Sequence, residues 1–203
     1  MNKGEIQIPI LNDKGLLAGT FVSFSDHIFN EPTLLIKFAK WRNDNLKFFL
    51  NQETSTFEST GSYIRSAIDD PQKNMFLMLD VSNRVVGHFG FNVISENTVE
   101  LDNLLRTNEK IEVDFVLWAE RAMIQYIFEE RKYSSIQLRM LSSNVLARRL
   151  HESIGFELSS TSPLMKAFTK AGGVSLVPSN GEKTPDAHLL EFELAFNKDA
   201  DAI

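Results

Sequence analysis

The sequence predicts an α+β fold in which a mixed, mostly antiparallel central sheet is flanked by helices on both faces, giving a three-layer sandwich. Three strand-like runs, residues 75–81, 85–94 and 98–106, are separated by turns short enough for an antiparallel meander. Helical patterns stand before and after this meander in the chain. The predicted order around the meander is a pair of helices before it, then a long helix, a strand, a short helix and a closing strand.

The part before the meander alternates extended and helical patterns. Residues 6–10 and 20–24 can extend and pair across a polar turn. Apolar side chains recur at helical spacing in residues 33–43. Thr56 offers the start of the next helix, which the apolar spacing continues as far as Pro71. These signals predict an N-terminal hairpin followed by the pair of helices.

The part after the meander is regular at first and then becomes irregular. Residues 113–133 form the longest helical pattern, and residues 135–141 are typical of a strand. Residues 161–186 carry Pro and Gly, so we expect a loop there with one short strand near 174–177. Residues 188–196 have the pattern of a closing strand.

Length and charge limit the class of protein. The 203 residues fit a single domain over residues 1–203, with a core at 33–156 and an irregular C-terminal segment at 157–203. The formal net charge is -6 and the pI is about 5.3, without any long basic run. A surface that neutralises phosphates is therefore not expected, and neither is a nucleic-acid partner.

Cysteine, histidine and hydropathy patterns exclude further classes. The chain has no cysteine, and its four histidines are scattered, so we expect no metal site. No apolar run approaches the roughly 20 residues that a membrane-spanning helix needs. We therefore expect a cytoplasmic protein without a membrane span.

Residues 144–156, N-V-L-A-R-R-L-H-E-S-I-G-F, combine a helix start, an apolar face and a helix stop. Asn144 can cap a short helix on which Ala147 and Ile154 share one face. Gly155 stands where a helix end needs a left-handed residue. With the strand before it, this block resembles the acetyl-CoA arm of the GCN5-related N-acetyltransferases (GNAT). In that family the strand and the following helix part in a V, and the pantetheine arm of CoA lies along the opened strand edge.

Further motifs resemble one branch of the same superfamily. They are Trp41-Arg42-Asn43, Thr56 with Thr60, Gly87-His88-Phe89-Gly90 and Leu101-Asp102-Asn103-Leu104-Leu105-Arg106. Over residues 33–156 the chain is similar to acetyltransferases that modify amino sugars on nucleotide-linked precursors of bacterial surface polysaccharides. It is more distantly similar to the ribosomal-protein alanine acetyltransferases. The resemblance implies acetyl-CoA-dependent N-acetylation of a small-molecule amine, with a nucleotide-linked amino sugar as the first candidate.

The same resemblance implies where acetyl-CoA binds. The family places the pyrophosphate at the loop that enters the long helix, with an Arg or Gln followed by glycines. Arg106 fits the first position, but residues 107–113 contain no glycine and the loop carries acids. Acids also stabilise any helix N-terminus, so they do not by themselves exclude CoA. The expected cofactor-binding residues are Leu104, Leu105, Arg106, Thr107, Lys110, Asn144 and Ala147.

The resemblance also implies candidates for proton transfer. Strand alternation puts Glu100 and Asp102 on one face, with Asp102 the preferred general base and Glu100 the second choice. Either carboxylate could instead be a solvated strand-end group. His151 follows Asn144 by seven positions, where many relatives carry a Tyr that protonates the departing thiolate. The alternative for His151 is a surface histidine without a catalytic task.

The candidate acceptor-binding residues are Trp41, Arg42, Asn43, His88 and Asn103. A Trp ring can stack on a sugar or base and an Arg can pair with a diphosphate, but core packing explains Trp41 equally well. His88 is more simply a structural histidine of a middle strand. Asn103 could orient the acceptor or hold a turn.

The sequence leaves other functions open. N-terminal acetylation of a ribosomal or other protein would suit the acidic surface. A non-catalytic module that binds acyl-CoA, or a scaffold, would suit the loop without glycines. The oligomeric state also stays open, with a dimer among the alternatives.

Overall fold

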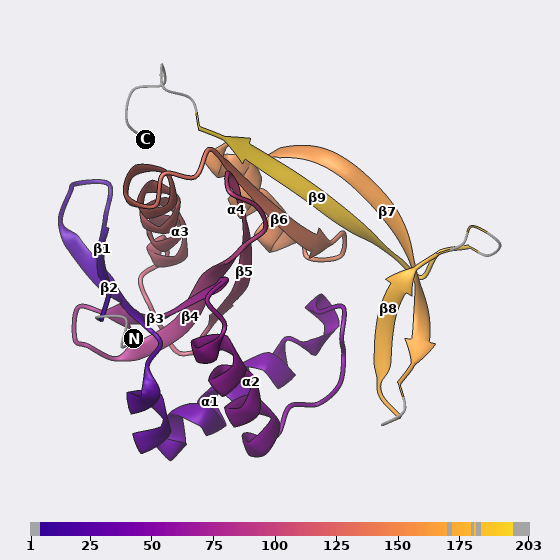
Figure 1. The fold of residues 1–203 in the computed structure, drawn as a ribbon, viewed down its shortest axis with the longest axis horizontal. Coiled ribbons are helices and arrows are strands. Elements are labelled where there is room, and N and C mark those ends of the chain that lie inside the picture. Colours follow the sequence, from indigo (N-terminus) through magenta and orange to yellow (C-terminus); the bar gives the residue numbers. More distant parts are fainter. Residues whose placement is uncertain (1–4, 170–171, 180, 182–183, 197–203) are drawn as a thin grey trace.

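In the computed structural model, the strands form one continuous sheet with the order β1-β2-β3-β4-β5-β6-β9-β7-β8 (Figure 1). The structure describes residues 5–169, 172–179, 181 and 184–196. The strands are β1 (Gln7–Leu11), β2 (Leu17–Ser23), β3 (Lys73–Asp80), β4 (Val85–Val93), β5 (Thr98–Arg106), β6 (Ser135–Leu141), β7 (Glu157–Phe168), β8 (Val174–Pro178) and β9 (Ala187–Ala195). Neighbouring strands run antiparallel except for β5 and β6, which are parallel.

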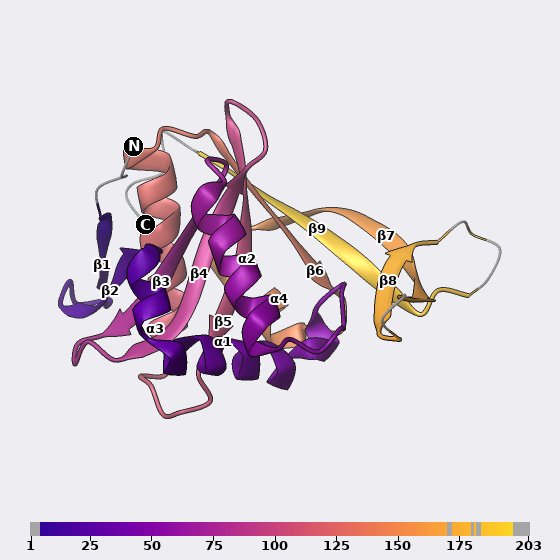
Figure 2. The same ribbon diagram turned by 60° about the horizontal axis from the view of Figure 1, so that its bottom comes forward.

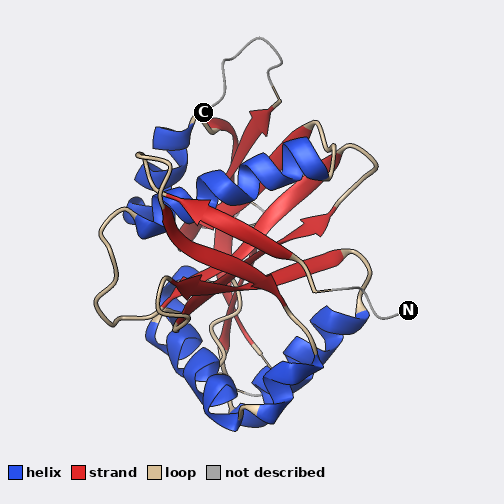
Figure 3. Cartoon of the chain, turned by 90° about the vertical axis from the view of Figure 1, so that its left-hand side faces the viewer, coloured by secondary structure: helices blue, strands red, loops and turns tan. Residues whose placement is uncertain are grey.

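Helices cover both faces of this sheet (Figure 3). They are α1 (Pro32–Asp44), α2 (Phe57–Asp69), α3 (Phe115–Gln125), which continues into a π-helical turn (Tyr126–Glu130), and α4 (Val145–Ile154). Two 3₁₀ turns, Asp26–Asn30 and Leu46–Phe48, flank α1. The predicted α+β sandwich is therefore confirmed, as is each helix predicted from apolar spacing.

Two apolar clusters fasten the helices to the sheet. The larger one joins β1 to β6 and β9 with α3 and α4, and it includes Phe21, Phe76, Phe89, Phe91 and Phe192. The smaller one holds α1 and α2 against the opposite face, and it includes Leu34, Leu35, Phe38, Trp41 and Ile64. Burial of this many apolar side chains on both faces is the main source of stability.

The pairing of β5 with β6 is short. Residues Thr98–Leu101 of β5 pair in parallel with residues 135–138 of β6. Beyond these pairs β5 stays on β4 as far as Arg106, while β6 stays on β9 as far as Leu141. The two strands therefore diverge toward their C-terminal ends, and Figure 2 shows β6 leaving the direction of β5.

The C-terminal segment differs from the prediction. The short strand predicted near 174–177 is confirmed as β8, but the loop predicted for the start of 161–186 is wrong, because β7 extends to Phe168 and pairs antiparallel with β8 as a projecting arm (Figure 1). β7 also pairs with β9 along most of its length. Most β7 side chains are exposed or half-buried, so the strand lacks the apolar alternation that sequence analysis uses. The closing strand predicted at 188–196 is confirmed as β9.

The N-terminus of α2 carries a reciprocal cap. Thr56 Oγ1 accepts a hydrogen bond from the Ser59 amide at 3.2 Å, and Ser59 Oγ accepts one from the Thr56 amide at 2.9 Å. Two backbone donors that the helix itself cannot pair are thus satisfied by side chains. This cap fixes the point at which the long α1–α2 connection becomes helical.

His88 lies under α1 in an aromatic environment. Its ring centroid is 5.0 Å from that of Phe38 and 6.5 Å from that of Trp41, and the residue is only 6% exposed. Burial lowers the pKa of His88 to about 4; the Asn103 backbone opposes this shift and the charge of Arg42 adds to it. His88 is therefore neutral near pH 7, as a packed part of the fold.

We predict that Thr56→Ala lowers the free energy of unfolding by about 1 kcal/mol, because the Ser59 amide loses its acceptor. Denaturant unfolding measures this change. Thr54→Ala is the matched control, since Thr54 is exposed and lies in the same connection. An equal loss in both variants would contradict the assigned cap.

We predict that His88 makes the fold less stable in acid. Its pKa is about 4 in the folded state and about 6.5 when unfolded, so the unfolded chain binds more protons between these values. Stability therefore falls as pH drops from 6.5 toward 4, by about 3 kcal/mol relative to a His88→Gln variant. Denaturant unfolding at pH 7 and pH 4 measures the difference. The exposed His27, changed to Gln, should give the wild-type pH dependence.

Candidate active site

A β-bulge in β5 shapes the centre of the site. Gly90 of β4 pairs with Asp102, and His88 pairs with Leu105. Between these two pairs β4 has one residue and β5 has two, so β5 contains one extra residue, which is a β-bulge. Asn103 lies inside this bulge with a left-handed φ of 58°. Asn is among the few residues besides Gly that adopt this conformation readily. The bulge lies where β5 has just lost β6 as a partner.

The Asp102 carboxylate is held by neutral amides. It accepts hydrogen bonds from the Asn103 backbone amide at 2.7 Å, from Asn103 Nδ2 at 2.6 Å and from Asn92 Nδ2 at 3.1 Å. Asn103 Nδ2 also donates to the Tyr63 hydroxyl at 2.7 Å, which links β5 to α2. Burial raises the pKa of Tyr63 to about 12, and the Asp102 charge contributes. Tyr63 therefore remains a neutral hydroxyl beside the carboxylate.

Glu100 is in a different environment. Its Oε1 forms an ion pair with Arg139 Nη2 of β6 at 2.9 Å. The hydrogen bond to Glu100 raises the pKa of Arg139, and the charges of Glu100, Glu191 and Asp102 act in the same direction. Glu100 is thus neutralised by a cation, whereas Asp102 is bonded to amides. Of the two predicted bases, Asp102 is the better placed to accept a proton.

Trp41 and Arg42 are placed by packing. Trp41 is 6% exposed within the smaller cluster, so its ring is not available as a stacking surface. Arg42 donates from Nη2 to the Asn51 carbonyl at 2.9 Å, and its guanidinium lies 4.2 Å from the ring centroid of Phe49. Burial lowers the pKa of Arg42, while the negative charge of Asp102 is among the groups that oppose this. Arg42 therefore holds the α1–α2 connection through its hydrogen bond to Asn51. It is also close enough to Asp102 for the two charges to interact.

Asn43 also holds this connection. Its Nδ2 donates to the Ser55 carbonyl at 2.9 Å, and its Oδ1 accepts from the Ser55 amide at 2.8 Å. Both ends of the Asn43 amide are thereby used by main-chain groups. The predicted contact of Asn43 with an acceptor would have to compete with these bonds.

The α1–α2 connection is joined to the C-terminal arm. The Gln52 amide donates to the Val174 carbonyl, and the Leu176 amide donates to the Leu50 carbonyl, both at 2.8 Å. The isolated bridge between Asn51 and Ser175 belongs to the same contact. Main-chain bonds thus run without a break from β5 through β6, β9, β7 and β8 to the connection that Arg42 holds.

The loop between β5 and α3 is where the CoA pyrophosphate was predicted. Thr107 is buried, its amide donates to the Val86 carbonyl at 2.7 Å, and its Oγ1 accepts from the Glu109 amide at 3.1 Å. Arg106 is exposed, and its Nη1 donates to the Thr107 carbonyl at 3.2 Å. Lys110 is exposed as well. The two cations are free to turn toward an anion without breaking the core.

The start of α3 can also contribute to anion binding. Among the described residues, no side chain caps this helix, and its N-cap residue Asp114 makes no side-chain cap bond. First-turn N–H groups without an internal partner are able to bind an anion. Glu109, Glu112 and Asp114 are exposed around this loop. Their charge would oppose a pyrophosphate, and the Phe115 amide already donates to the Glu112 carbonyl at 3.2 Å. The fit therefore depends on Arg106, Lys110 and the first-turn amides that follow Phe115.

α4 begins and ends as the sequence predicts. Asn144 Oδ1 accepts from the Ala147 amide at 3.4 Å, and Gly155 closes the helix with a φ of 111°. Leu105 is buried at the bulge, while Leu104 packs against the larger apolar cluster. The candidates for the CoA arm therefore line β5 and the start of α4, on either side of the divergence.

His151 lies on the buried face of α4. Its Nδ1 is 2.5 Å from Oε1 of Glu120, which is on α3 and has no exposed surface. His151 is therefore a buried histidine, and the alternative of a surface histidine is wrong. Its predicted role toward the thiolate stays a prediction, now with a buried carboxylate as its partner.

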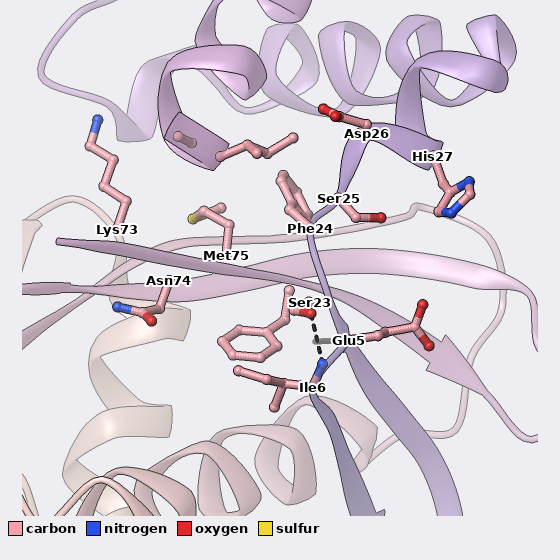
Figure 4. A pocket seen from close by; sticks show the side chains of 13 residues that line it. Glu5, Ile6, Ser23, Phe24, Ser25, Asp26, His27, Lys73, Asn74 and Met75 are labelled. Carbon is pink, nitrogen blue, oxygen red and sulfur yellow. Dashed lines mark hydrogen bonds between the residues drawn. The ribbon is translucent and has the colours of Figure 1, made fainter. Parts of the chain in front are cut away.

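A cavity of about 390 Å³ lies elsewhere, between the end of α2 and strands β2 and β3 (Figure 4). Phe24 and Met75 point into it, while Asp26 and Lys73 stand at its margin. Ser23 in its wall already accepts a hydrogen bond from the Ile6 amide at 2.9 Å. None of the predicted site residues lines this cavity.

Sequence reasoning missed several polar residues that the structure adds to the site. They are Tyr63, Asn92, Glu120 and Arg139. Asn92 lies two residues beyond Gly90 and could have been found from strand alternation with Asp102. The other residues carry no local signal, because each meets its partner through tertiary packing. The described residues contain no group of His and acidic side chains suited to a metal, and none of their helices is long and apolar enough to cross a membrane.

Known structures share this fold. An acetyltransferase of the GNAT family from Bacillus anthracis superposes with a TM-score of 0.67 at 17% identity, covering 94% of this chain and 98% of that one. Spermidine N-acetyltransferase from Vibrio cholerae, in complex with CoA and spermine, gives 0.67 at 13% identity, covering 88% and 95%. The Salmonella typhimurium enzyme that modifies the N-terminal serine of ribosomal protein L7/L12 gives 0.68 at 11% identity, covering 95% and 100%.

Sequence comparison identifies the family. A comparison with curated proteins gives no match. A family model described as the acetyltransferase (GNAT) domain matches residues 34–170, which include the bulge of β5, the start of α3 and the cap of α4. The chain therefore belongs to the GNAT acetyltransferases, the N-acyltransferases that use acetyl-CoA as donor.

Proposed function

We propose that the chain transfers the acetyl group of acetyl-CoA to a primary amine, with Asp102 as the base. The observation that carries this proposal is the Asp102 carboxylate at the bulge, oriented by Asn92 and Asn103 and hydrogen-bonded to no cation among the described residues. It stands where β5 and β6 diverge and where main-chain groups of β5 have no partner on β6. A fixed carboxylate beside an open strand edge suits amine activation next to a bound thioester.

The residues present fit the donor in three places. The edge of β5 beyond Leu101 lacks its β6 partner, so its main-chain groups are available to the pantetheine amides. Arg106, Lys110 and the first-turn amides of α3 that follow Phe115 would bind the pyrophosphate. A main-chain N–H of β5 beyond Leu101 would polarise the thioester carbonyl; this is not the N–H of Asn103, which already donates to Asp102 Oδ1 at 2.7 Å. Asp102 would take the proton of the attacking amine, and His151 would protonate the departing thiolate.

The acceptor is best assigned as a small molecule. We keep the nucleotide-linked amino sugar as the first candidate, supported by the carboxylate of Asp102 and the carboxamide of Asn103. Trp41 and Asn43 no longer support it, because one is buried and the other is bonded to the main chain.

A cationic amine or a protein N-terminus is the second candidate. Glu191 adds its charge to those of Glu100 and Asp102 around Arg139, and Arg42 is a second cation near Asp102, so three carboxylates are balanced by two cations on this side. The similar enzymes from Vibrio cholerae and Salmonella typhimurium act on spermidine and on a protein N-terminal serine. An acidic surrounding favours a positively charged acceptor. A panel with amino sugars, polyamines and short peptides separates these acceptors.

We predict that acetyl-CoA binds with micromolar affinity and that Arg106→Ala weakens it about tenfold, because a charge-assisted bond to phosphate is lost. Isothermal titration calorimetry measures both values. Lys166→Ala, at an exposed position of β7 in the projecting arm, is the control for loss of one positive charge. Absence of binding up to millimolar acetyl-CoA would favour the scaffold alternative and remove the proposed function.

We predict that Asp102→Asn lowers kcat by about 10² to 10⁴-fold with the best acceptor, while the Kd for acetyl-CoA changes little. The amide keeps the shape of the side chain but cannot take up the amine proton. Steady-state kinetics and calorimetry give the two readouts. Glu100→Gln is measured in parallel. A larger loss of kcat in Glu100→Gln than in Asp102→Asn would assign the base to Glu100.

A further inference from the structure

Glu120 and His151 form a buried ionisable pair between α3 and α4. Glu120 has no exposed surface, and the His151 side chain is 9% exposed. The Glu120 Oε1 and His151 Nδ1 atoms lie 2.5 Å apart, which puts the two side chains in direct hydrogen-bond contact. The His151 ring also meets the edge of Phe156, with ring centroids 5.8 Å apart. Glu120 is therefore fully buried beside the larger cluster, and the small exposed surface of the pair belongs to His151.

A buried carboxylate is costly unless a partner compensates its charge. His151 is the hydrogen-bond partner of Glu120 among the described residues, and Glu120 Oε2 is buried without a partner. Arg121, the next residue on α3, instead forms an ion pair with Asp13 at 2.9 Å. The charge of Glu120 is thus compensated through the imidazole or by a proton that the two side chains share.

The contact also distinguishes the two ring nitrogens of His151. Nδ1 is used by Glu120, so a proton on Nδ1 is fixed by that hydrogen bond. Nε2 is left as the nitrogen that can exchange a proton with a second partner. A protonated ring facing the Glu120 carboxylate is neutral as a pair and holds one transferable proton, on Nε2.

We propose that Glu120 is a positioning residue that holds Nδ1–H of His151 so that Nε2 delivers the proton to the CoA thiolate. This inference rests on the proposed function. The amine nitrogen bonds to the acetyl carbon, the C–S bond breaks and its electron pair goes to sulfur, which takes the proton from Nε2. The ring is left neutral with Nδ1–H still on Glu120. The amine proton passes to Asp102, and exchange with solvent restores both groups.

The test compares Glu120→Gln, His151→Gln and the double variant. We expect Glu120→Gln to lower kcat about 10 to 100-fold with the KM for acetyl-CoA within about twofold, because only proton delivery is impaired. The double variant should be no slower than His151→Gln, since Glu120 acts through His151. Glu152→Gln is the matched control on α4, where Glu152 forms an exposed pair with Arg148. Losses that multiply in the double variant, or an unchanged kcat in Glu120→Gln, would overturn the proposal.

A second measurement keeps the proposal testable if Glu120→Gln does not fold. The chain has four histidines, so ¹⁵N-labelled imidazole spectra can be assigned with single His→Gln variants. We expect His151 of the wild-type protein to carry its proton on Nδ1 in a strong hydrogen bond. An unprotonated Nδ1 would refute the assigned role.

The outcomes also separate this inference from the proposed function. If the wild-type protein transfers acetyl to no amine of the panel, both the proposed function and the role of Glu120 are refuted, whatever the spectra show. Transfer that depends on Asp102 but not on His151 would leave the proposed base in place and remove the role of Glu120.

Discussion

The fold depends on the short parallel pairing between β5 and β6. Both strands are held firmly on their outer sides, β5 by β4 and β6 by β9, so they cannot close on each other beyond Leu101 and Leu138. Main-chain donors and acceptors along the opened edges need another partner, because unpaired buried backbone groups are costly. α3 follows β5 and α4 follows β6, which brings the starts of both helices to the same opening. In the proposed function, this opening in the sheet is where acetyl-CoA binds.

The sheet separates two chemical environments. On the α3 side the core is aromatic and aliphatic, and the buried Glu120–His151 hydrogen bond lies beside it. On the α1–α2 side, Asp102 and Asn103 lie among amides, a Tyr hydroxyl and charged groups. The bulge in β5 lies between these environments. An acyl donor at the opening would have proton acceptors on one side and a proton donor on the other.

In the proposed function, the arm and the α1–α2 connection lie on the acceptor side. Leu50 and Gln52 extend the sheet beyond β8, while Arg42 and Asn43 tie the same connection to α1. The residues that resemble an acceptor-binding motif, Arg42 and Asn43, therefore hold the α1–α2 connection, which would form a wall of the proposed site. Substitutions in such a wall can change which sizes and charges of acceptor fit the site without moving Asp102. Acceptor diversity on a common fold is understandable in these terms.

Local signals in the sequence determined most of the fold. The meander, the Thr56 cap, the Asn144 cap and the Gly155 stop each depend on residues within a few positions of one another, so propensity and spacing suffice to predict them. The acetyltransferase family was also apparent from residues 144–156 and the shorter motifs. β7 was missed because its conformation comes from pairing with β9 and β8, and its mostly exposed side chains carry no clear pattern.

Only the tertiary structure decided how the site is assembled. Asn103 meets Tyr63 across 40 positions, Glu120 meets His151 across 31, and Arg139 meets Glu100 across 39. These contacts depend on strand register and helix packing, which no local pattern encodes. The same packing buried Trp41, which the sequence offered as an acceptor contact. The sequence thus determined the elements and the family, whereas the packed sheet and helices decided which polar groups face one another.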